Sequence, residues 1–339
     1  MSRIFVHGTG AISPAGWGSS RLMEAVVAQR RVVPSEIIRP NCSKPLPVNR
    51  VPPPETRPAY LSHPRMRRAS PISQFAVGAA LEAVGPDKSH IAEGALRLGI
   101  LFCAFTGSVN YSRRFYAEVL TNPAGASPLL FTETVFNAPA SHLAAVLGSP
   151  AITYTLVGDQ GEFIKALALA AQWLEEEQVD ACLVVGAEEA DWLTADALRM
   201  FSPDLVAAEG SAAVYLRREP SAIELRSVSD AHLYRRPSGR TEAASRLGES
   251  FGRGDGAGDL LCDGLAGTRD DDSEAKAWSD WNGHRISVRS LLGEGFAAMG
   301  GWQAVAAVES LRSGRATRGI VSVVGGNLQA IGAEFQFRA

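Results

Sequence analysis

Apolar segments of strand length alternate with longer segments of helical periodicity along most of the chain. This pattern predicts strands over residues 4–6, 98–102, 152–157 and 181–185, and helices over residues 20–29, 72–84, 113–120, 141–146 and 162–174. Continuous apolar strands that alternate with helices favour an α/β fold with a parallel sheet covered on both faces. Glycines at 8 and 10 predict a turn after the first strand.

The chain changes character twice. Residues 34–64 are dense in proline, which predicts a long surface excursion, and residues 217–258 are polar and rich in Arg and Gly. A second series follows, with strands predicted over 260–262, 285–288, 320–324 and 333–337 and helices over 274–281 and 296–311. The order loosely repeats the first half, so we expect two related halves, 1–220 and 221–339.

Composition and charge exclude several classes of function. The 339 residues carry 33 Lys and Arg against 36 Asp and Glu, so no basic surplus directs the chain to nucleic acid. The four cysteines, at 42, 103, 182 and 262, show no CxxC spacing, which argues against a zinc site and a disulfide framework. The chain has no uninterrupted apolar stretch long enough for a membrane span, and we expect a cytoplasmic protein.

Five separate stretches, in order along the chain, carry a resemblance to a known family. They are residues 6–14 (VHGTGAISP), 65–68 (RMRR, followed by Phe75-Ala76), 137–144 (NAPASHLA), 180–188 (DACLVVGAE) and 325–327 (GGN). Together they resemble the β-ketoacyl synthase family of acyltransferases. This resemblance implies a thiolase-like fold with two related βαβαβ halves in a layered α/β/α/β/α arrangement.

The chemistry of that family directs attention to three positions. The resemblance implies a cysteine at the N-terminus of a buried helix, which gains thiolate character there and attacks an acyl thioester. Two histidines assist decarboxylation of the malonyl extender and stabilise the negative charge that develops. Counting from the matched motifs, the cysteine position falls on Gln160, and the first histidine position on Asp263 in residues 263–274. The second falls on Glu294 in residues 289–294, with Arg289 in place of a lysine.

These replacements imply a protein that does not condense acyl groups. A glutamine amide cannot carry an acyl group, and two carboxylates at an oxyanion site raise the barrier to condensation. The loss of all three groups resembles the chain-length-factor subfamily, silent partners of active ketosynthases in fatty acid, polyketide or aryl polyene biosynthesis. The implied partners are an active ketosynthase, in a heterodimer, and an acyl carrier protein, whose phosphopantetheine is the only implied cofactor; no metal is implied. The segments 263–294 and 311–320 are shorter than in that subfamily.

The residues at these positions also admit different interpretations. Gln160 can be a buried polar residue at a helix start, and Asp263, Glu294 and Arg289 can form a buried ion network. A sharper hypothesis makes Asp263 and Glu294 a new acid/base pair of a hydrolase or lyase. Two further functions stay open: a Gln-type malonyl-carrier-protein decarboxylase, which would retain the histidines, and a homodimeric acyl-binding protein.

Peripheral residues complete the predicted site. The resemblance places Leu130, Phe131, Thr134 and Asn137 at a dimer interface bordering an acyl tunnel. Arg65, Arg67 and Arg68, together with Arg113 and Arg114, are candidate contacts for an acidic carrier protein, or solvated helix faces. His142 is expected to be a packed core residue, and Cys103 and Cys182 inert buried thiols. An apolar strand over 152–157 at a sheet edge would require a partner.

Overall fold

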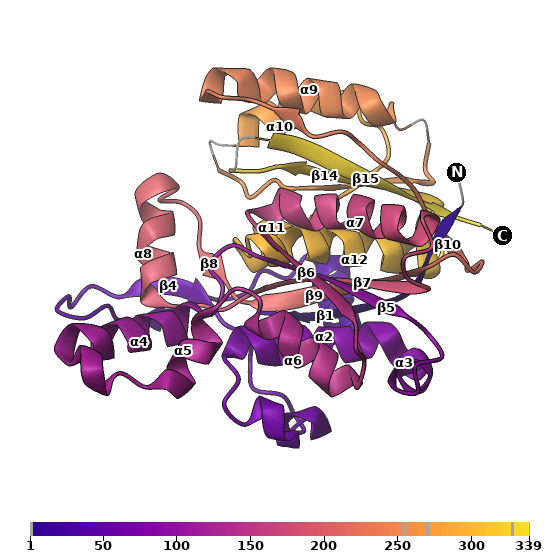
Figure 1. The fold of residues 1–339 in the computed structure, drawn as a ribbon. Helices are drawn as coiled ribbons and strands as arrows, with labels where there is room; N and C mark the ends of the chain where they lie inside the picture. The colour runs from indigo at the N-terminus through magenta and orange to yellow at the C-terminus, as the bar shows by residue number, and fades with distance from the viewer. Residues whose placement is uncertain (1–2, 253, 255, 269–270, 327–328, 339) are drawn as a thin grey trace.

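The computed structural model describes residues 3–338 except 253, 255, 269, 270, 327 and 328. Its elements form five layers, α/β/α/β/α (Figure 1). Helices α7 (Gln160–Glu175) and α12 (Ala297–Arg312) form the middle layer between two half-sheets. The layered α/β fold expected from the sequence is therefore confirmed.

The first half-sheet has the strand order β1-β9-β7-β5-β6. Strands β5, β6 and β7 are parallel to one another, whereas β9 runs antiparallel to both β7 and β1. The bounds are β1 Ile4–Ser13, β5 Leu98–Ala104, β6 Ile152–Val157, β7 Ala181–Glu188 and β9 Gly210–Arg217, and the two-residue β2 Gly16–Trp17 pairs with β1. Strand β6 ends the order, so the apolar strand over 152–157 does lie at a sheet edge.

The second half-sheet has the order β13-β12-β14-β15-β10, and β10 joins it to β1 through a short antiparallel contact at Ile4 and Phe5. The bounds are β10 Ile223–Val228, β11 His232–Leu233, β12 Asp259–Asp263, β13 His284–Ser287, β14 Arg318–Val324 and β15 Gln329–Phe337. Strands β12, β13 and β14 are parallel, and β13 forms the other edge. The strands of the two halves therefore make one continuous twisted sheet.

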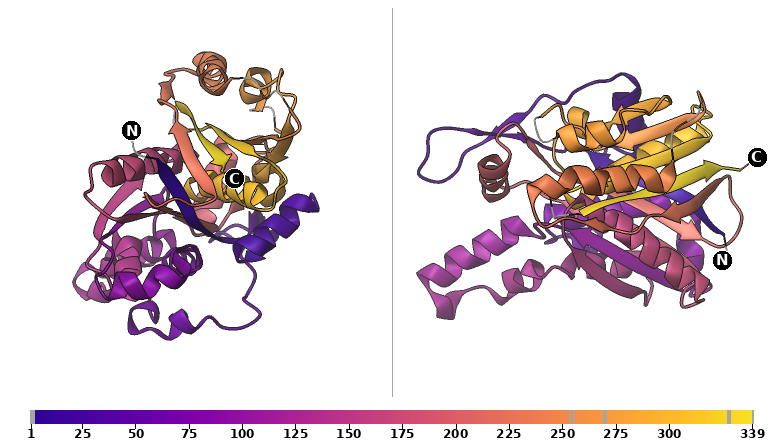
Figure 2. Two further views of the ribbon diagram at one scale, coloured as in Figure 1. Left: turned by 90° about the vertical axis from the view of Figure 1, so that its right-hand side faces the viewer. Right: turned by 90° about the horizontal axis from the view of Figure 1, so that it is seen from above.

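The remaining helices cover the outer faces or lie at the rims (Figures 1 and 2). Their bounds are α1 Ser19–Val27, α2 Pro71–Val84, α3 Lys88–Ala92, α4 Val109–Thr121, α5 Pro128–Thr134, α6 Ala138–Leu147, α8 Trp192–Phe201, α9 Arg240–Phe251, α10 Asp272–Ala277 and α11 Val288–Leu292. Helices α2 and α6 pack on the first half-sheet, and α9 and α10 on the second. The largest core surrounds α12, which is buried along almost its whole length.

The predicted turn at residues 8–11 is wrong, because β1 continues through these residues. The two glycines serve close packing instead. A Cβ atom at Gly8 would lie 1.8 Å from the carbonyl oxygen of Ala83, and one at Gly10 would lie 2.0 Å from that of Ala79. Helix α2 therefore lies directly on the backbone of β1, which only glycine allows.

The proline-dense stretch 34–64 and the Arg-rich stretch 217–258 contain more structure than their composition suggests. Within residues 34–64, β3 (Ser35–Ile37) and β4 (Leu46–Asn49) form a small sheet with β8 (Ala207–Ala208), and 3₁₀ turns follow at Ala59–Ser62 and Pro64–Met66. Further 3₁₀ turns lie at Gly85–Asp87, Pro123–Gly125 and Pro237–Gly239. The Arg-rich stretch 217–258 contains β10, β11 and α9. These three elements were not predicted, because charged residues interrupt the apolar pattern of β10 and α9 and because β11 has only two residues.

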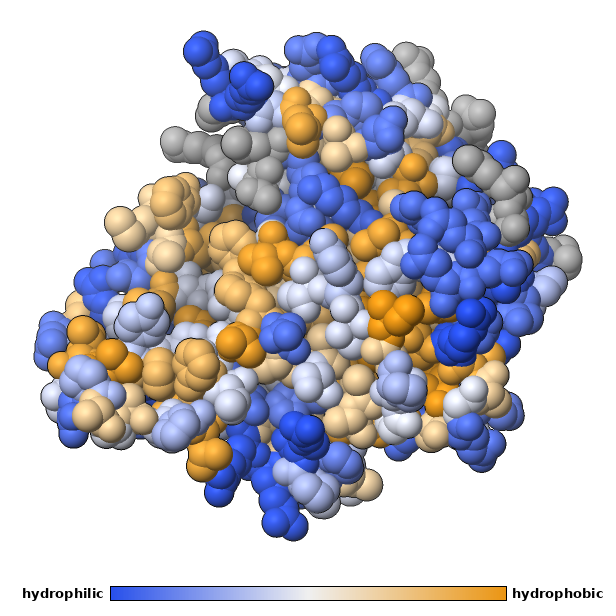
Figure 3. Space-filling model, viewed as in Figure 1, coloured by the Kyte–Doolittle hydropathy of each residue, from blue (hydrophilic) through white to orange (hydrophobic). Residues whose placement is uncertain are grey.

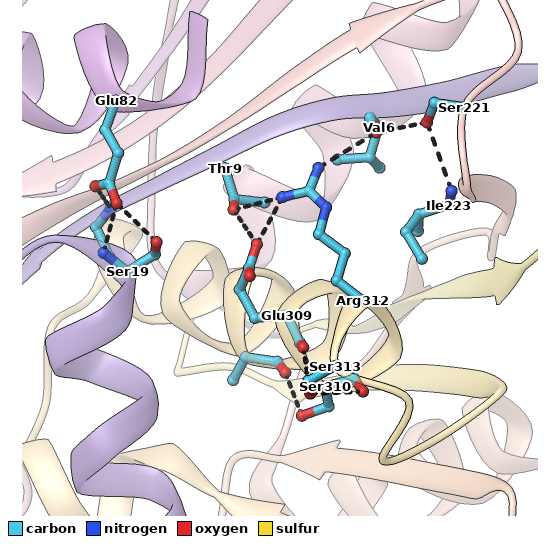
Figure 4. A network of polar contacts seen from close by, with 12 residues as sticks. Val6, Thr9, Ser19, Glu82, Ser221, Ile223, Glu309, Ser310, Arg312 and Ser313 are labelled. Carbon is cyan, nitrogen blue, oxygen red and sulfur yellow. Dashed lines mark hydrogen bonds and ion pairs between the residues drawn. The ribbon is translucent and has the colours of Figure 1, made fainter. Parts of the chain in front are cut away.

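A polar network ties the end of α12 to β1 (Figure 4). The Arg312 guanidinium donates to Thr9 Oγ1 at 3.1 Å and to Glu309 at 2.6 Å, and Thr9 Oγ1 donates to the same Glu309 carboxylate at 2.5 Å. On the other side of β1, Glu82 of α2 accepts from the backbone N–H of Ala11 and Ser19. These contacts fix the middle layer against the N-terminal strand.

Candidate functional site

Gln160 lies where the middle layer meets the first half-sheet. Strand β6 ends at Val157, and Asp159 then caps α7 by accepting a hydrogen bond from the N–H of Gly161 at 3.1 Å. Gln160 is the first residue of α7 and is buried. The sequence therefore places a neutral amide at a helix N-terminus, where partial positive charge favours an anion.

The anion at this helix start is Glu294. The Gln160 side-chain amide donates to both carboxylate oxygens of Glu294, at 2.9 and 2.8 Å. The N–H of Phe296 donates to Glu294 at 2.7 Å, and the Arg289 guanidinium forms an ion pair with it. Each oxygen of this buried carboxylate is thus bound by strong donors, as a buried charge requires.

The backbone of Glu294 is fixed as firmly as its side chain. Its N–H donates to Val206 and its carbonyl oxygen accepts from Ala208, both at 2.8 Å. Gly293 beside it has φ 88°, and a Cβ atom there would lie 2.5 Å from the carbonyl oxygen of Val206. The loop before α12 is therefore held against the small β3-β4-β8 sheet, and Glu294 has little freedom to leave Gln160.

Asp263 lies at the end of β12, in a second group of polar residues. Its carboxylate accepts from Ser287 Oγ at 2.5 Å and from the N–H of Leu265 at 3.2 Å, and lies 3.2 Å from the Arg285 guanidinium. Glu274 of α10 lies nearby, accepting from Ser322 Oγ at 2.5 Å and from the N–H of Gly264 at 3.2 Å. Both carboxyl groups are fully buried or nearly so.

Burial and mutual repulsion change the acidity of this carboxyl pair. Burial, together with the negative charge of Asp263, raises the pKa of Glu274 to about 7. Burial also raises the pKa of Asp263, against the opposing effects of the Ser287 hydrogen bond and the Arg285 charge. At neutral pH the pair therefore tends to hold a proton, which lowers the cost of burying two acids together.

Arg289 connects the two groups of polar residues. One guanidinium nitrogen binds Glu294, and another donates to the carbonyl oxygen of Gly264, at 3.2 Å, next to Asp263. The structure thus brings Gln160, Glu294 and Arg289 into direct contact, as one buried ion network. The acid/base hypothesis for Asp263 and Glu294 paired these two residues, whereas the carboxyl group whose pKa the charge of Asp263 raises, together with burial, is Glu274.

Two aromatic rings lie beside this network. Phe105 follows β5 and stacks on Phe296 with ring centroids 4.8 Å apart. Glu188, at the end of β7, holds Phe105 and Thr106 by accepting from their backbone N–H groups. Burial raises the pKa of Glu188 to about 7. Phe296 has φ 44°, a left-handed conformation that is unfavourable for a bulky side chain and that the Glu294 contact and the stack support.

Four of these residues were not among the predicted site residues. Glu274 appeared only as the end of a matched segment, and no local pattern showed that it lies against Asp263. The Phe105–Phe296 stack joins residues from different halves of the chain, so periodicity could not reveal it. Only Glu188 had a signal in the sequence, because it is an acidic residue that directly follows the apolar stretch 181–187.

The predicted interface residues divide between core and surface. Leu130 is buried, Phe131 and Asn137 are exposed, and Thr134 is half-buried with its hydroxyl donating to the carbonyl oxygen of Phe131. His142 is buried, and its Nε2 lies 3.0 Å from the carboxylate of Glu133, so it joins α6 to α5. Strand β6 exposes about half of each of Ile152, Tyr154 and Val157 (51%, 55% and 52%). Figure 3 shows further apolar side chains over α4 and α5.

The predicted carrier-contact arginines are not brought into one cluster of free charges. Arg65, Arg67 and Arg68 are exposed around the second 3₁₀ turn. Arg113 is paired with the buried Asp191, its Nε 2.9 Å from the carboxylate, and Arg114 lies over the Tyr111 ring. The third residue of the predicted closing motif, Asn327, lies outside the described residues. Cys103 and Cys182 are buried, which raises the pKa of both thiols.

Comparison with solved structures places the fold. A β-ketoacyl synthase from Burkholderia phymatum STM815 superposes with a TM-score of 0.81 at 14% identity, over the full length of both chains. The ishigamide ketosynthase/chain length factor gives 0.80 at 18% identity, covering 99% of this chain and 100% of that chain. A ketosynthase in complex with its chain length factor from Xenorhabdus doucetiae gives 0.77 at 14% identity, covering 99% and 98%. The chain therefore has the thiolase-like ketosynthase fold.

The two comparisons by sequence give no match: no family model matches the chain, and no curated protein matches it. Among the residues that the structure describes, no helix has the length and apolarity needed to cross a bilayer.

Proposed function

We propose that this chain is a catalytically silent, chain-length-factor-like partner of an active ketosynthase. The observation that carries the proposal is the Gln160–Glu294–Arg289 network, which fills the positions where the family resemblance implies a cysteine and a histidine. The third such position, Asp263, is bound to Ser287 and Arg285. In this proposal the network closes a vestigial site of its own.

The chemistry of the network supports the absence of condensing activity. Decarboxylative condensation requires a nucleophile and hydrogen-bond donors aimed at a developing oxyanion. Here the amide donors of Gln160 are already bound to Glu294, and Asp263 and Glu294 present oxygen acceptors instead of imidazole N–H groups. All three side chains are buried, so a thioester would have to displace an ion pair in order to enter.

The same facts weigh against a decarboxylase, a hydrolase and a lyase. A Gln-type decarboxylase must use donors to stabilise an enolate, and a carboxylate at position 294 opposes that charge. A hydrolase or lyase built on Asp263 and Glu294 needs the two groups in reach of one substrate. Asp263 instead forms an ion pair with Arg285, and its charge acts on the neighbouring Glu274.

The exposed edge of β6 supports a protein partner. An unpaired edge strand with exposed apolar side chains is a template for another chain. Ile152, Tyr154 and Val157 provide such an edge, and Phe105, 44% exposed, follows the neighbouring strand β5. In the proposal the ketosynthase pairs here to form a heterodimer, while Phe131 of α5 contributes to the wall of the partner's acyl tunnel.

The proposal includes an acyl carrier protein as the third component. The exposed Arg65, Arg67 and Arg68 supply the positive charge that an acidic carrier would meet. The carrier brings phosphopantetheine with it, so this chain binds no cofactor of its own. The pathway is of the fatty acid, polyketide or aryl polyene type, and the assembly is cytoplasmic.

Pairing can be tested with variants of the β6 edge. The chain is co-expressed with the intact Cys-His-His ketosynthase encoded nearest to it, and the mass of the complex is measured during size-exclusion chromatography. We expect a 1:1 complex, loss of the complex in Tyr154→Asp, and no loss in Leu233→Asp, a control at an even more exposed apolar residue of β11. A chain that stays monomeric or forms only homodimers beside the ketosynthase contradicts the proposal.

A further inference from the structure

The second edge of the sheet borders a groove that the ketosynthase pairing does not use. Strand β13 is the last strand of its half-sheet, and its outer side pairs with no strand among the residues that the structure describes. A groove of about 390 Å³ lies between β13 and α1. Met23, Val26 and Val27 of α1 form one wall, and residues 284–286 of β13 form the other. A helix facing a free strand edge across a groove is suited to an added strand.

The floor of the groove is apolar and its rim is basic. Leu260, Ile286 and Ala316 supply apolar surface, while Arg315 supplies positive charge. The Arg315 guanidinium makes no ion pair with any residue that the structure describes, and the same holds for the exposed Arg30 and Arg31 just beyond α1. The described residues that line the groove include no Asp or Glu. The occupant that complements this charge is acidic.

Strand β13 is held rigidly on its inner side. Its register places His284 and Ile286 opposite Leu260 and Cys262 of β12. Arg285 and Ser287, which alternate with them, both bind the buried Asp263. The free edge is therefore preformed, so a docking strand would not have to order it first.

We propose that this groove binds an extended acidic peptide segment of a partner protein, which pairs with β13 and places apolar side chains against α1. Main-chain hydrogen bonds along β13 give affinity, alternate apolar side chains fill the floor, and acidic side chains meet Arg315 and its neighbours. The interaction is separate from the β6 edge and does not depend on the ketosynthase pairing.

The first test selects ligands without assuming one. A random heptapeptide library is selected against the full chain, and the affinity of the most enriched peptide is measured by fluorescence anisotropy. We expect enriched peptides with alternating apolar and acidic residues, and affinities at least tenfold weaker for Arg315→Glu and for Val27→Asp. Arg57→Glu, an exposed charge reversal outside the groove, is the control and should bind as the original chain does.

A second measurement locates the contact without changing the protein. Hydrogen exchange of residues 284–287 should slow when the peptide binds, and a peptide N-methylated at alternate positions should lose both the affinity and the protection. Absence of enrichment, enrichment of basic or uncharged sequences, or unchanged binding by Arg315→Glu overturns the proposal. Self-association of the chain that Arg315→Glu abolishes would assign the groove to a second copy and would overturn it as well.

Discussion

Gln160 and Glu294 stand 134 positions apart in the chain, yet one side-chain amide binds both oxygens of the other residue's carboxylate. Gln160 begins one helix of the middle layer, and Glu294 precedes the other. Their contact therefore joins the two central helices at their N-terminal ends. The family resemblance implies reacting groups at this place, whereas the structure shows a closed ion network.

The contribution of the amide can be measured by removing it. Gln160→Ala leaves the Glu294 carboxylate without two of its donors, and a hydrogen bond to a charged group contributes about 1.5–3 kcal/mol. We expect the free energy of unfolding, from urea denaturation, to fall by about 2 kcal/mol. Gln172→Ala, an exposed glutamine of the same helix, should change it by less than about 0.5 kcal/mol. Equal values for the two variants would show that the amide is not part of the network.

Arg289 should be harder to replace than Gln160. Arg289→Met leaves the buried Glu294 without a cation, and breaking a buried pair in this way costs about 3–5 kcal/mol. The double variant Arg289→Met, Glu294→Gln removes the unpaired charge, so we expect it to regain at least half of that loss. Denaturation of the single and double variants measures this coupling. A double variant whose loss equals the sum of the two single losses would mean that the residues do not interact.

The acidity of Glu274 gives the protein a characteristic dependence of stability on pH. Its pKa in the folded chain, about 7, exceeds the ordinary value of 4.5, so the folded state holds the proton at pH values where the unfolded state releases it. This group therefore destabilises the protein increasingly as the pH rises from about 4.5 to 7, by roughly 1.4 kcal/mol per unit. Below that range the effect is absent, and above it the effect is complete.

The variant Glu274→Gln isolates this contribution, because Gln does not ionise. We expect it to match the original chain near pH 4 and to be more stable at pH 8, by on the order of 3 kcal/mol. Glu249→Gln, at an exposed glutamate, is the control, and its free energy of unfolding should differ from that of the original chain by the same small amount at every pH. A constant difference between Glu274→Gln and the original chain at all pH values would refute the raised pKa.

The glycines of β1 lead to a prediction about packing. Gly10→Ala places a methyl group 2.0 Å from the carbonyl oxygen of Ala79, so α2 must move away from the strand. Overpacking of this kind costs typically about 1–3 kcal/mol. Thermal unfolding should show a clear loss of stability, whereas Gly256→Ala, whose added methyl meets no atom within 4 Å, should show almost none. If Gly10→Ala were as stable as the original chain, glycine at this position would not be required for packing.

The sequence was most informative where one matched motif predicted both a site position and the fold around it. Counting from the matched motifs predicted that Gln160, Asp263 and Glu294 replace the family's three reacting groups, and in the structure each lies at or near the end of a strand or the start of a helix. The thiolase-like layers followed from the same motifs. The apolar pattern also identified β6 as a strand, although only the assembled sheet shows that it is an edge.

Other features depended on tertiary contacts. The glycines at 8 and 10 suggested a turn, but their role is set by α2, which lies about 70 residues away. Elements β10 and α9 have charged exposed residues that hid their periodicity, and β11 is only two residues long. Glu274 and the Phe105–Phe296 stack join segments that no local pattern connects. Motif spacing therefore predicted the three positions, whereas the groups that neutralise and enclose them became visible only in the fold.

The central claim is that this chain supports condensation without performing it. The most direct measurement is a malonyl-carrier condensation assay with this chain alone, the paired ketosynthase alone, and the two together. The account predicts turnover only in the mixture, retained when Gln160→Ala is used and lost when the partner's nucleophilic cysteine is replaced by alanine. Turnover by this chain alone, or its loss in the mixture with a folded Gln160→Ala variant, would contradict the account.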